Sequence, residues 1–391
     1  MREVLRGITI DNGGSEVRVL PNGSSLSDMI TMSSDFVEIA QKDFRVKEVY
    51  EPKNLCMIKK APKSEYLGII AQGLTGKSYN GVSLALNAGE DKTKNINYYK
   101  QFIFAVARDA IDAYLSEATI TPVKKGLFKK VDTYENEEIT YKYVIVTCIP
   151  IREHSGSKDC AAVLKNNIAG EYEVDFPLLP SAPTVRFVIE SKYVGVTPEG
   201  GVAIAMLRNQ LKEDDVTLVV DLGRLTADIA LFRGTSLLGK VESSTYAGSM
   251  LVGEVKAALE EEGYKLTDEQ AEYTIRTGAV RVGTHDENVS KIIDECRVNF
   301  VANNLKEDIL RCLQRNKITS SQVQNFLPIG AAMSDTGKGS VQRAIIDSCG
   351  LKDAAVVSVN CDCRYVNIKA ASVYLQKLFE AVKQTEESAE A

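Results

Sequence analysis

The chain has 391 residues, of which 44% are hydrophobic and 26% are charged. A chain of that length favours two lobes over one continuous core. The formal net charge of −6 argues against a broad electrostatic grip on DNA. We therefore expect no direct DNA binding, and any link to DNA is expected to pass through a basic adaptor protein.

Targeting and cysteine patterns favour a cytoplasmic protein. The N-terminal sequence MREVLRG has no apolar segment of the secretory type. The sequence contains no run of about 18 apolar residues, so it predicts no membrane helix. Eight cysteines in a chain without a signal indicate reduced thiols. Cys361 and Cys363 form an isolated C-x-C pair and only two histidines occur, so we expect no cysteine or histidine metal site.

The first predicted element is a β-hairpin over residues 7–20, GITIDNGGSEVRVL. An apolar strand ends at Asp11, the turn contains Gly13 and Gly14, and a hydroxyl follows at Ser15. The alternation of the next residues is typical of a second strand.

The middle of the chain predicts a helix between strands. Residues 95–117 carry apolar side chains at helical spacing, which indicates a core-facing helix. Residues 141–148, YKYVIVTC, predict a buried strand, and residues 185–189 predict another strand that ends at Glu190. Residues 200–209 predict a helix that leads into the second half of the chain.

A second hairpin of the same kind follows at residues 216–234, VTLVVDLGRLTADIALFRG. Its first strand ends at Asp221, Gly223 follows, and Thr226 and Asp228 add a hydroxyl and a second carboxylate. A turn of this type can direct backbone N–H groups and a hydroxyl at phosphate oxygens. An ordinary hairpin has a similar composition, because turns favour Asp and Gly. The repeated pattern favours two related lobes that each contribute one phosphate-binding turn to a shared cleft.

Helices dominate the rest of the second half. Residues 249–262 predict a helix directly after Gly248, so its N-terminal amides could face a nucleotide. Thr267 and Gln270 have the spacing of a capping box. Residues 287–314 predict one long amphipathic helix.

Three motifs in this order resemble those of the actin, sugar-kinase and heat-shock-chaperone ATPase superfamily. They are the two hairpin turns and the segment FLPIGAAM at residues 326–333, which resembles the adenosine motif of that family. The resemblance covers nearly the whole chain and implies an α/β, actin-like two-lobed fold, each lobe a mixed sheet flanked by helices, with a nucleotide cleft between the lobes. It implies a first lobe at residues 1–192 with a small variable subdomain at about 36–95, a second lobe at 193–364, and a C-terminal helix at 365–391 that returns to the first lobe.

The resemblance also implies ATP or ADP as the bound nucleotide, together with Mg²⁺. Asp11 and Asp221 are expected to act in catalysis and to hold Mg²⁺ mainly through water. Each would otherwise repel the triphosphate at a cost of roughly 1–4 kcal/mol. Arg18 stands where the family has a phosphate-reaching lysine, and its guanidinium offers a fork of donors. The residues implied in nucleotide binding are Asn12, Gly13, Gly14, Ser15, Arg18, Gly223, Arg224, Thr226, Gly248, Glu254, Gly330, Ala331, Ala332 and Met333.

Glu190 and the segment YAGSMLVGEV at residues 246–255 resemble most the plasmid-segregation, ParM-like branch. In that branch a Glu at the matching place positions the attacking water, so the resemblance implies this catalytic role for Glu190. Phosphoryl transfer depends mostly on positioning and charge stabilisation, which a carboxylate at a strand end can supply. The alternatives are a surface strand terminus for Glu190 and an exposed helical residue for Glu254.

The function implied is a filament-forming ATPase whose slow hydrolysis is coupled to polymerisation. Such a filament would drive plasmid DNA segregation through an adaptor bound to a centromere-like DNA site. A monomeric small-molecule kinase of the same superfamily is the alternative. Arg224, Leu225 and Ala331 depart from the usual small residues of the motifs. Arg224 and Leu225 leave a nucleotide-dependent cytoskeletal scaffold as a third possibility, and the imperfect adenosine motif with Ala331 leaves the choice of ATP over GTP open.

Overall fold

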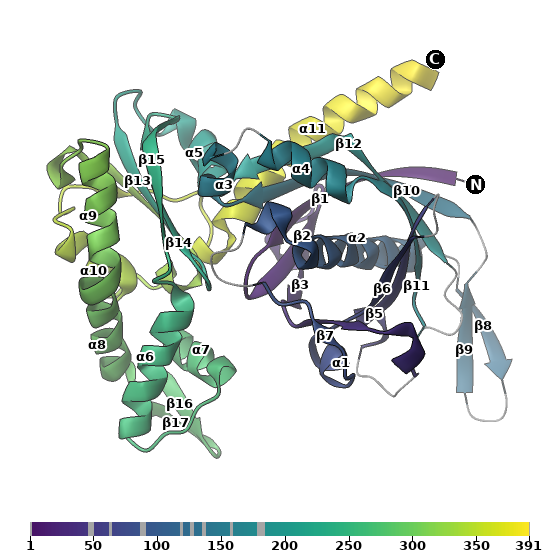
Figure 1. The fold of residues 1–391 in the computed structure, drawn as a ribbon, viewed down its shortest axis with the longest axis horizontal. Helices are drawn as coiled ribbons and strands as arrows, with labels where there is room; N and C mark the ends of the chain where they lie inside the picture. The colour runs from purple at the N-terminus through teal and green to yellow at the C-terminus, as the bar shows by residue number, and fades with distance from the viewer. Residues whose placement is uncertain are drawn as a thin grey trace.

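The computed structural model describes residues 2–45, 51–61, 65–86, 91–117, 120–125, 129–134, 138–156, 159–177 and 184–390. These residues form two lobes, each a mixed β-sheet flanked by helices (Figure 1). The α/β class and the two-lobed architecture predicted from the sequence are confirmed. None of the helices in the described ranges has the length and apolar content that a membrane span requires. All eight cysteines are free thiols.

The described part of the first lobe has a sheet of ten strands in the order β3-β2-β1-β10-β12-β11-β5-β6-β4-β7. The central strands β1, β10 and β12 are parallel, so their carboxyl ends lie at one edge of the sheet. β2 returns antiparallel to β1 and forms the predicted first hairpin. The strands are β1 (Arg2–Asn12), β2 (Glu16–Pro21), β3 (Ile30–Ser33), β4 (Phe36–Ile39), β5 (Leu55–Ala61), β6 (Glu65–Gln72), β7 (Val82–Ser83), β10 (Ile139–Ile149), β11 (Gly170–Asp175) and β12 (Val185–Pro198).

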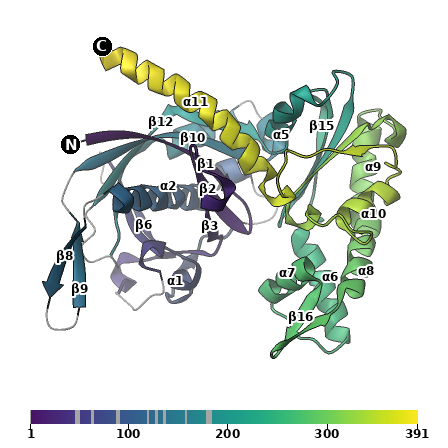
Figure 2. The ribbon, with the colours of Figure 1, turned by 180° about the vertical axis from the view of Figure 1, so that it is seen from behind.

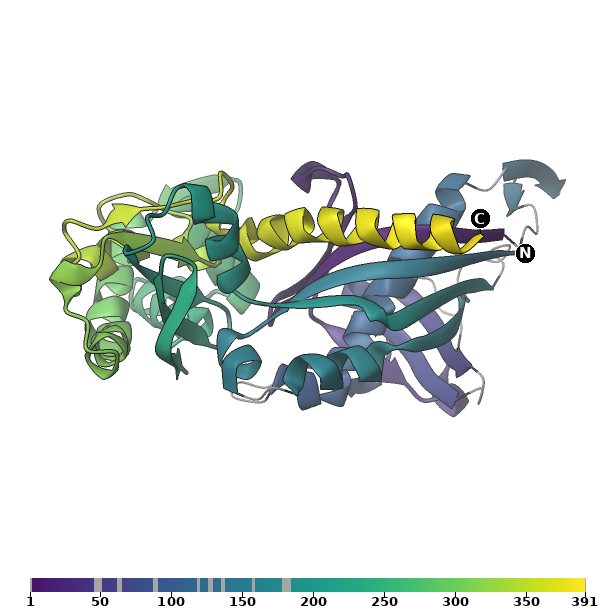
Figure 3. The ribbon, with the colours of Figure 1, turned by 90° about the horizontal axis from the view of Figure 1, so that it is seen from above.

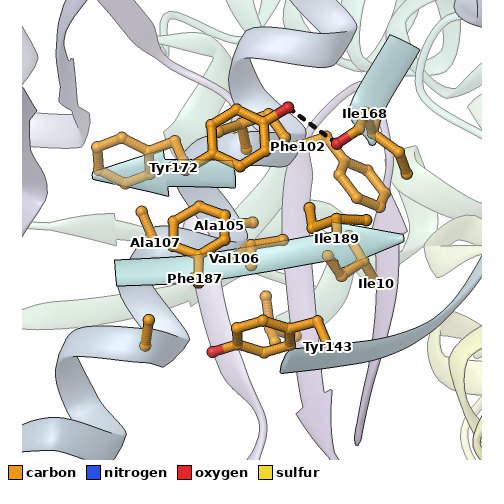
Figure 4. Packing of buried hydrophobic residues seen from close by; sticks show 14 of the residues in the cluster. Ile10, Phe102, Ala105, Val106, Ala107, Tyr143, Ile168, Tyr172, Phe187 and Ile189 are labelled. Carbon is orange, nitrogen blue, oxygen red and sulfur yellow. Dashed lines mark hydrogen bonds between the residues drawn. The ribbon is translucent and has the colours of Figure 1, made fainter. Parts of the chain in front are cut away.

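One face of this sheet is covered by the predicted helix α2 (Ile96–Glu117). Figure 4 shows Phe102 of this helix packed among aromatic side chains of the sheet. The rings of Tyr172 and Phe187 stack with centroids 4.9 Å apart, and the Tyr172 hydroxyl donates to the Ile168 carbonyl at 2.8 Å. The lobe also contains α1 (Gly73–Lys77), α3 (Ile151–Gly156) and α4 (Cys160–Ile168), and a separate hairpin of β8 (Ile120–Lys125) and β9 (Lys129–Tyr134).

The second lobe has a sheet of five strands among its described residues, in the order β15-β14-β13-β18-β19. β13 pairs antiparallel with β14, as the second predicted hairpin requires, and parallel with β18. The elements are β13 (Val216–Leu222), β14 (Ala227–Arg233), β15 (Ser236–Ser244), β16 (Ala279–Val282), β17 (His285–Asn288), β18 (Asn325–Ile329), β19 (Ala355–Val356), α5 (Gly201–Met206), α6 (Gly248–Glu261), α7 (Asp268–Thr277), α8 (Ser290–Phe300), α9 (Lys306–Arg315) and α10 (Val341–Ser348).

The predicted helix at residues 287–314 differs in detail from the structure. Glu287 pairs with Val280 in the small β16–β17 hairpin, so the helix begins only at Ser290. The segment Val301–Leu305 has π-helical geometry and separates α8 from α9. The capping box is present as predicted, because the Gln270 amide donates to the Thr267 hydroxyl at 3.2 Å.

The two lobes share a third hydrophobic core. α11 (Val366–Glu390) leaves the second lobe and lies along β1 and β10 of the first, as Figures 2 and 3 show from behind and from above. Val146 of β10, Val219 of β13 and Leu375 of α11 belong to this shared core. Strand β12 stays in the first sheet as far as Pro198, so the chain crosses to the second lobe after Pro198 rather than at residue 193.

Candidate functional site

A cavity of about 810 Å³ lies between the two lobes. It is lined by both hairpin turns, by residues of α6 and α7, and by the small residues after β18. Strand β1 is parallel to β10 in the first sheet, and β13 is parallel to β18 in the second. The carboxyl ends of β1 and β13 both lie at the cavity, since Asp11 and Asp221 are among its lining residues. The fold therefore brings the two repeated motifs together, although they are distant in sequence.

The first turn is held by a short network around Arg18. The Gly13 amide donates to the Glu16 carbonyl at 3.0 Å, which closes the turn. Asp11 and Arg18 are opposed across β1 and β2, and the Arg18 guanidinium donates to the Asp11 carboxylate at 3.1 Å. Arg18 also bonds the Glu16 carboxylate at 2.8 Å and the Arg364 carbonyl at 3.0 Å. A positive charge therefore lies beside Asp11 at the cavity wall.

The second turn has the same backbone closure. The Gly223 amide donates to the Thr226 carbonyl at 3.0 Å, the same distance as in the first turn. Asp221 and Asp228 are opposed across β13 and β14, where the first hairpin has an aspartate and an arginine. The two hairpins thus place different charges at equivalent positions.

Arg224 and Leu225 make the second turn unlike the expected pattern. The Arg224 guanidinium lies 3.4 Å from the Glu272 carboxylate of α7. The side chain of Leu225 reaches the first turn, and a Cβ built on Gly14 would lie only 2.9 Å from the Leu225 Cγ. The two turns therefore touch, and a side chain at residue 14 would separate them.

The predicted adenosine motif forms the third wall. Gly330 has φ of 106°, and a Cβ there would lie 2.1 Å from the Leu222 carbonyl oxygen, so only glycine fits. Ala331 and Ala332 line the cavity and leave room for a flat group. Met333 is fully buried in the core of the second lobe.

Several carboxyl groups gather in the cavity with little access to water. Burial raises the pKa of Asp221 to about 8, the nearby Glu199 adds to the shift, and the hydrogen bond from Asn367 opposes it. Burial likewise raises the pKa of Asp228 and of Glu199. The Asp228 Oδ1 atom is buried and has no hydrogen-bond partner among the described residues. Such a concentration of acidic groups favours a bound cation.

Glu199 follows the end of β12 and has a fixed partner. The Lys92 ammonium lies 2.9 Å from its carboxylate. Lys92 is held in turn by Glu153, whose carboxylate accepts from the Lys92 amide at 2.8 Å and from the Thr93 amide at 3.0 Å. Burial works against the charged form of Lys92, but Glu199, Tyr98 and Asp11 together outweigh it, so the pKa of Lys92 is raised overall. The carboxylate of Glu199 is thus held at the cavity by an ion pair.

Most of the sequence-predicted site residues line the cavity together. They are Asp11, Gly13, Gly14, Ser15, Arg18, Asp221, Gly223, Arg224, Thr226, Gly248, Gly330, Ala331 and Ala332. Asn12, Glu190, Glu254 and Met333 are not among its lining residues. Asn12 donates to the Tyr98 carbonyl at 3.3 Å behind the first turn, and Glu254 accepts from Asn304 at 3.2 Å.

The expectation that Glu190 ends a strand is wrong. Strand β12 continues to Pro198, and its register against β10 shifts between the pairs Tyr143–Ile189 and Ile145–Val194. Glu190 lies in this irregular stretch and forms an ion pair with Lys192 at 2.8 Å. The acidic residue that follows the strand and faces the cavity is Glu199.

Sequence reasoning also missed Lys92, Glu153 and Asn367, which all line the cavity. A usable signal existed for Glu199, because it follows the alternating strand YVGVTP and precedes two glycines. No comparable signal marks Lys92, which lies in a charged polar segment, or Asn367, which lies near the start of a predicted helix.

The donor set fits a hydrated cation better than a cation bound by protein atoms alone. Across the described ranges, no three His, Cys, Asp or Glu side chains are placed to ligate one metal ion together. Asp11 and Asp221 nevertheless face the same cavity, and an unpartnered carboxylate oxygen of Asp228 lies beside them. Mg²⁺ commonly keeps several waters and takes only one or two carboxylates along with phosphate oxygens.

Comparison with known proteins gives matches of structure only. No family model matches the chain, and no curated protein matches it in sequence. Among solved structures, actin-like protein Alp7A superposes with a TM-score of 0.69 at 16% identity, over 99% of this chain and 100% of that one. A 15-stranded ParM filament from Clostridium botulinum gives 0.60 at 12% identity, over 96% and 100%. Bacillus thuringiensis ParM with AMPPNP gives 0.58 at 13% identity, over 95% and 98%. The protein therefore has the actin-like fold, in the form seen in ParM-type bacterial actins.

Proposed function

We propose that the protein is an actin-like ATPase that assembles with ATP into filaments. The observation that carries this proposal is the pair of hairpin turns with equal backbone closure that face one cavity between the lobes. Backbone amides of two such turns can cradle phosphate groups from both sides. The similar Bacillus thuringiensis structure contains AMPPNP, which supports a nucleotide as the ligand.

The cavity suggests an orientation for the nucleotide. The turns at residues 13–15 and 223–226 supply amides and hydroxyls for the phosphates. The Gly248 and Ser249 amides at the start of α6 donate to the carbonyls of Gly223 and Arg224, each at 2.9 Å, so this helix N-terminus holds the second turn in place. The small surface of Ala331 and Ala332 suits a flat base, and Glu272 and Arg276 of α7 also line the cavity.

Asp11 and Asp221 would hold Mg²⁺ through water on the phosphate side. The cation would supply charge neutralisation to the transferred phosphate. The Arg18 guanidinium donates to the Asp11 carboxylate at 3.1 Å, and the Asn367 side-chain amide donates to the Asp221 carboxylate at 2.8 Å. Both carboxylates therefore have fixed partners that orient them toward the cavity.

We assign to Glu199, rather than Glu190, the role of positioning the attacking water. Glu199 directly follows the parallel strand β12 and its carboxylate lines the cavity, whereas Glu190 does not line it. Burial raises the pKa of Glu199 and the adjacent Lys92 opposes that shift; the ionised carboxylate can accept a proton from water. Hydrolysis would be slow and coupled to polymerisation.

Self-association is the proposed partner interaction. The similar structure from Clostridium botulinum is a filament, which supports assembly for this chain also. We further propose that the filament acts in the cytoplasm on plasmid DNA through a basic adaptor. The net charge of −6 supports an adaptor over direct contact with DNA.

The test is sedimentation with light scattering of purified protein in Mg²⁺ with ATP, ADP or no nucleotide, together with phosphate release. Rapid assembly in ATP, then phosphate release and disassembly, is the expected result. ATP binding without assembly in concentrated protein, with phosphate passed to a small-molecule acceptor, would instead establish the kinase alternative. An Asp11→Asn variant serves as the control for site-dependent assembly.

A further inference from the structure

The chain passes between the lobes at two places that lie beside each other. The first crossing follows β12 at Glu199 and Gly200, and the second leads into α11 at Asn367. Both Glu199 and Asn367 line the cavity. A residue that joins the two crossings can therefore affect both the relation of the lobes and the geometry of the site.

Asn367 joins them through its side chain. Its Nδ2 donates to Asp221 Oδ2 at 2.8 Å, and its Oδ1 accepts from the Gly200 amide at 2.8 Å. The residue is 8% exposed, so water competes little for these two bonds. A side-chain amide can donate and accept at once, whereas a carboxylate only accepts.

The Gly200 amide is available to Asn367 because of a special backbone conformation. Gly200 has φ of 69°, and a Cβ there would lie 2.8 Å from Val219 Cγ1. The preceding residue, Glu199, is fixed from the other side, since its amide donates to the Ile149 carbonyl at 2.8 Å. Asn367 and Ile149 therefore hold the segment that carries Glu199 between them.

We propose that Asn367 is a positioning residue that sets the Asp221 and Glu199 carboxylates relative to each other across the two lobes. Asp221 is held directly and Glu199 through the Gly200 amide. Movement of the crossings during lobe closure would then be transmitted to both carboxylates together. This inference rests on the proposed function, because Asp221 and Glu199 are the groups assigned there to the cation and the water.

Two substitutions separate the two bonds. Asn367→Asp has nearly the same shape and keeps the acceptor for the Gly200 amide, but it replaces the amide donor to Asp221 by a second carboxyl group, which repels the ionised form of Asp221. Asn367→Leu loses both bonds. Asn304→Leu is the matched control, since Asn304 also donates to a carboxylate, that of Glu254, at 3.2 Å outside the cavity lining.

The first measurement is hydrogen–deuterium exchange of the Gly200 amide in the ligand-free protein. We expect faster exchange in Asn367→Leu and unchanged exchange in Asn367→Asp and in the control. Unchanged exchange in Asn367→Leu would overturn the proposal, whether or not the protein hydrolyses ATP. The tie is thus tested separately from the proposed function.

The second measurement is hydrolysis with saturating Mg²⁺ and ATP, beside nucleotide affinity without Mg²⁺. Loss of residues that orient catalytic or metal-binding groups typically costs about 10- to 100-fold in activity. We expect kcat to fall by that factor in both Asn367 variants, with affinity for the metal-free nucleotide within about threefold of wild type. Wild-type kcat in Asn367→Asp would refute the coupling to Asp221, even if Asn367→Leu fails to fold. A wild-type protein that neither binds nor hydrolyses nucleotide would refute the proposed function instead.

Discussion

Replacing Glu199 by Gln tests the assignment of the water-positioning carboxylate most directly. Gln keeps the size and one acceptor oxygen, but it removes the charge that faces Lys92 at 2.9 Å and the ability to take a proton. Loss of a general base costs about 10²- to 10⁴-fold in rate. At about 1.4 kcal/mol for each factor of ten, the barrier to hydrolysis rises by about 3–5.5 kcal/mol.

The same substitution leaves the Lys92 ammonium without its counter-charge. Removing one partner of a buried ion pair costs about 3–5 kcal/mol, and this is an upper bound here because the Gln oxygen still accepts a hydrogen bond. Thermal unfolding must therefore accompany the kinetics, so that a loss of folded protein is not mistaken for a loss of catalysis. Nucleotide binding should persist, and filaments formed in ATP should last longer because hydrolysis no longer destabilises them.

Glu190→Gln is the matched control, since it removes an equal charge from β12, the strand that precedes Glu199, and lies outside the cavity lining. Phosphate release and the lifetime of assembled protein are measured for both variants. Hydrolysis unchanged in Glu199→Gln, with a large loss in Glu190→Gln, would refute the assignment and restore the role inferred from the sequence.

Three further predictions follow from the cavity. Burial raises the pKa of Asp221 to about 8, so its contribution to stability is present at low pH and is lost as the pH rises from about 4 to about 8. The midpoint of thermal unfolding of the ligand-free protein should therefore fall less over this range in Asp221→Asn, and an equal fall would contradict the shift. Gly330→Ala should lower the free energy of unfolding by at least about 1–3 kcal/mol, because φ is 106° and the new Cβ meets the Leu222 carbonyl. Denaturant titration measures this change, and Gly253→Ala is the control: its Cβ meets nothing within 4 Å, so it should be neutral or stabilising. Chelation of Mg²⁺ should weaken ATP binding and stop hydrolysis, and calorimetric binding that is indifferent to a chelator would exclude a cation held near Asp11.

The repeated turns could be predicted because their signal is local. A strand that ends in Asp before glycine is visible at Asp11 and at Asp221, and the structure places both at one cavity. Glu199 was missed because β12 contains an irregular stretch at residues 190–193, which divides its apolar pattern into two parts. The first part alone predicts a strand, and that strand would end at Glu190.

Long-range pairs could not be predicted from one sequence. Lys92 meets Glu199 and Asn367 meets Asp221 only after the crossings are folded, at separations of 107 and 146 residues. Nothing in the charged segment around Lys92 indicates burial. The role of Arg224 was also open in the sequence, and the structure shows its side chain beside Glu272 of α7.

The position of α11 has a consequence for synthesis of the protein on the ribosome. The helix packs closely on the first lobe, since a Cβ at Gly7 would lie 2.7 Å from Phe379 and one at Gly195 would lie 2.9 Å from Tyr374. Domains generally begin to fold from the N-terminus as the chain emerges. Here the apolar face formed by Val144, Val146 and Cys148 lacks the cover of α11 until that helix is translated. The nascent first lobe therefore carries an exposed apolar surface until α11 emerges, and a ribosome that stalls before α11 would release a chain that chaperones must hold.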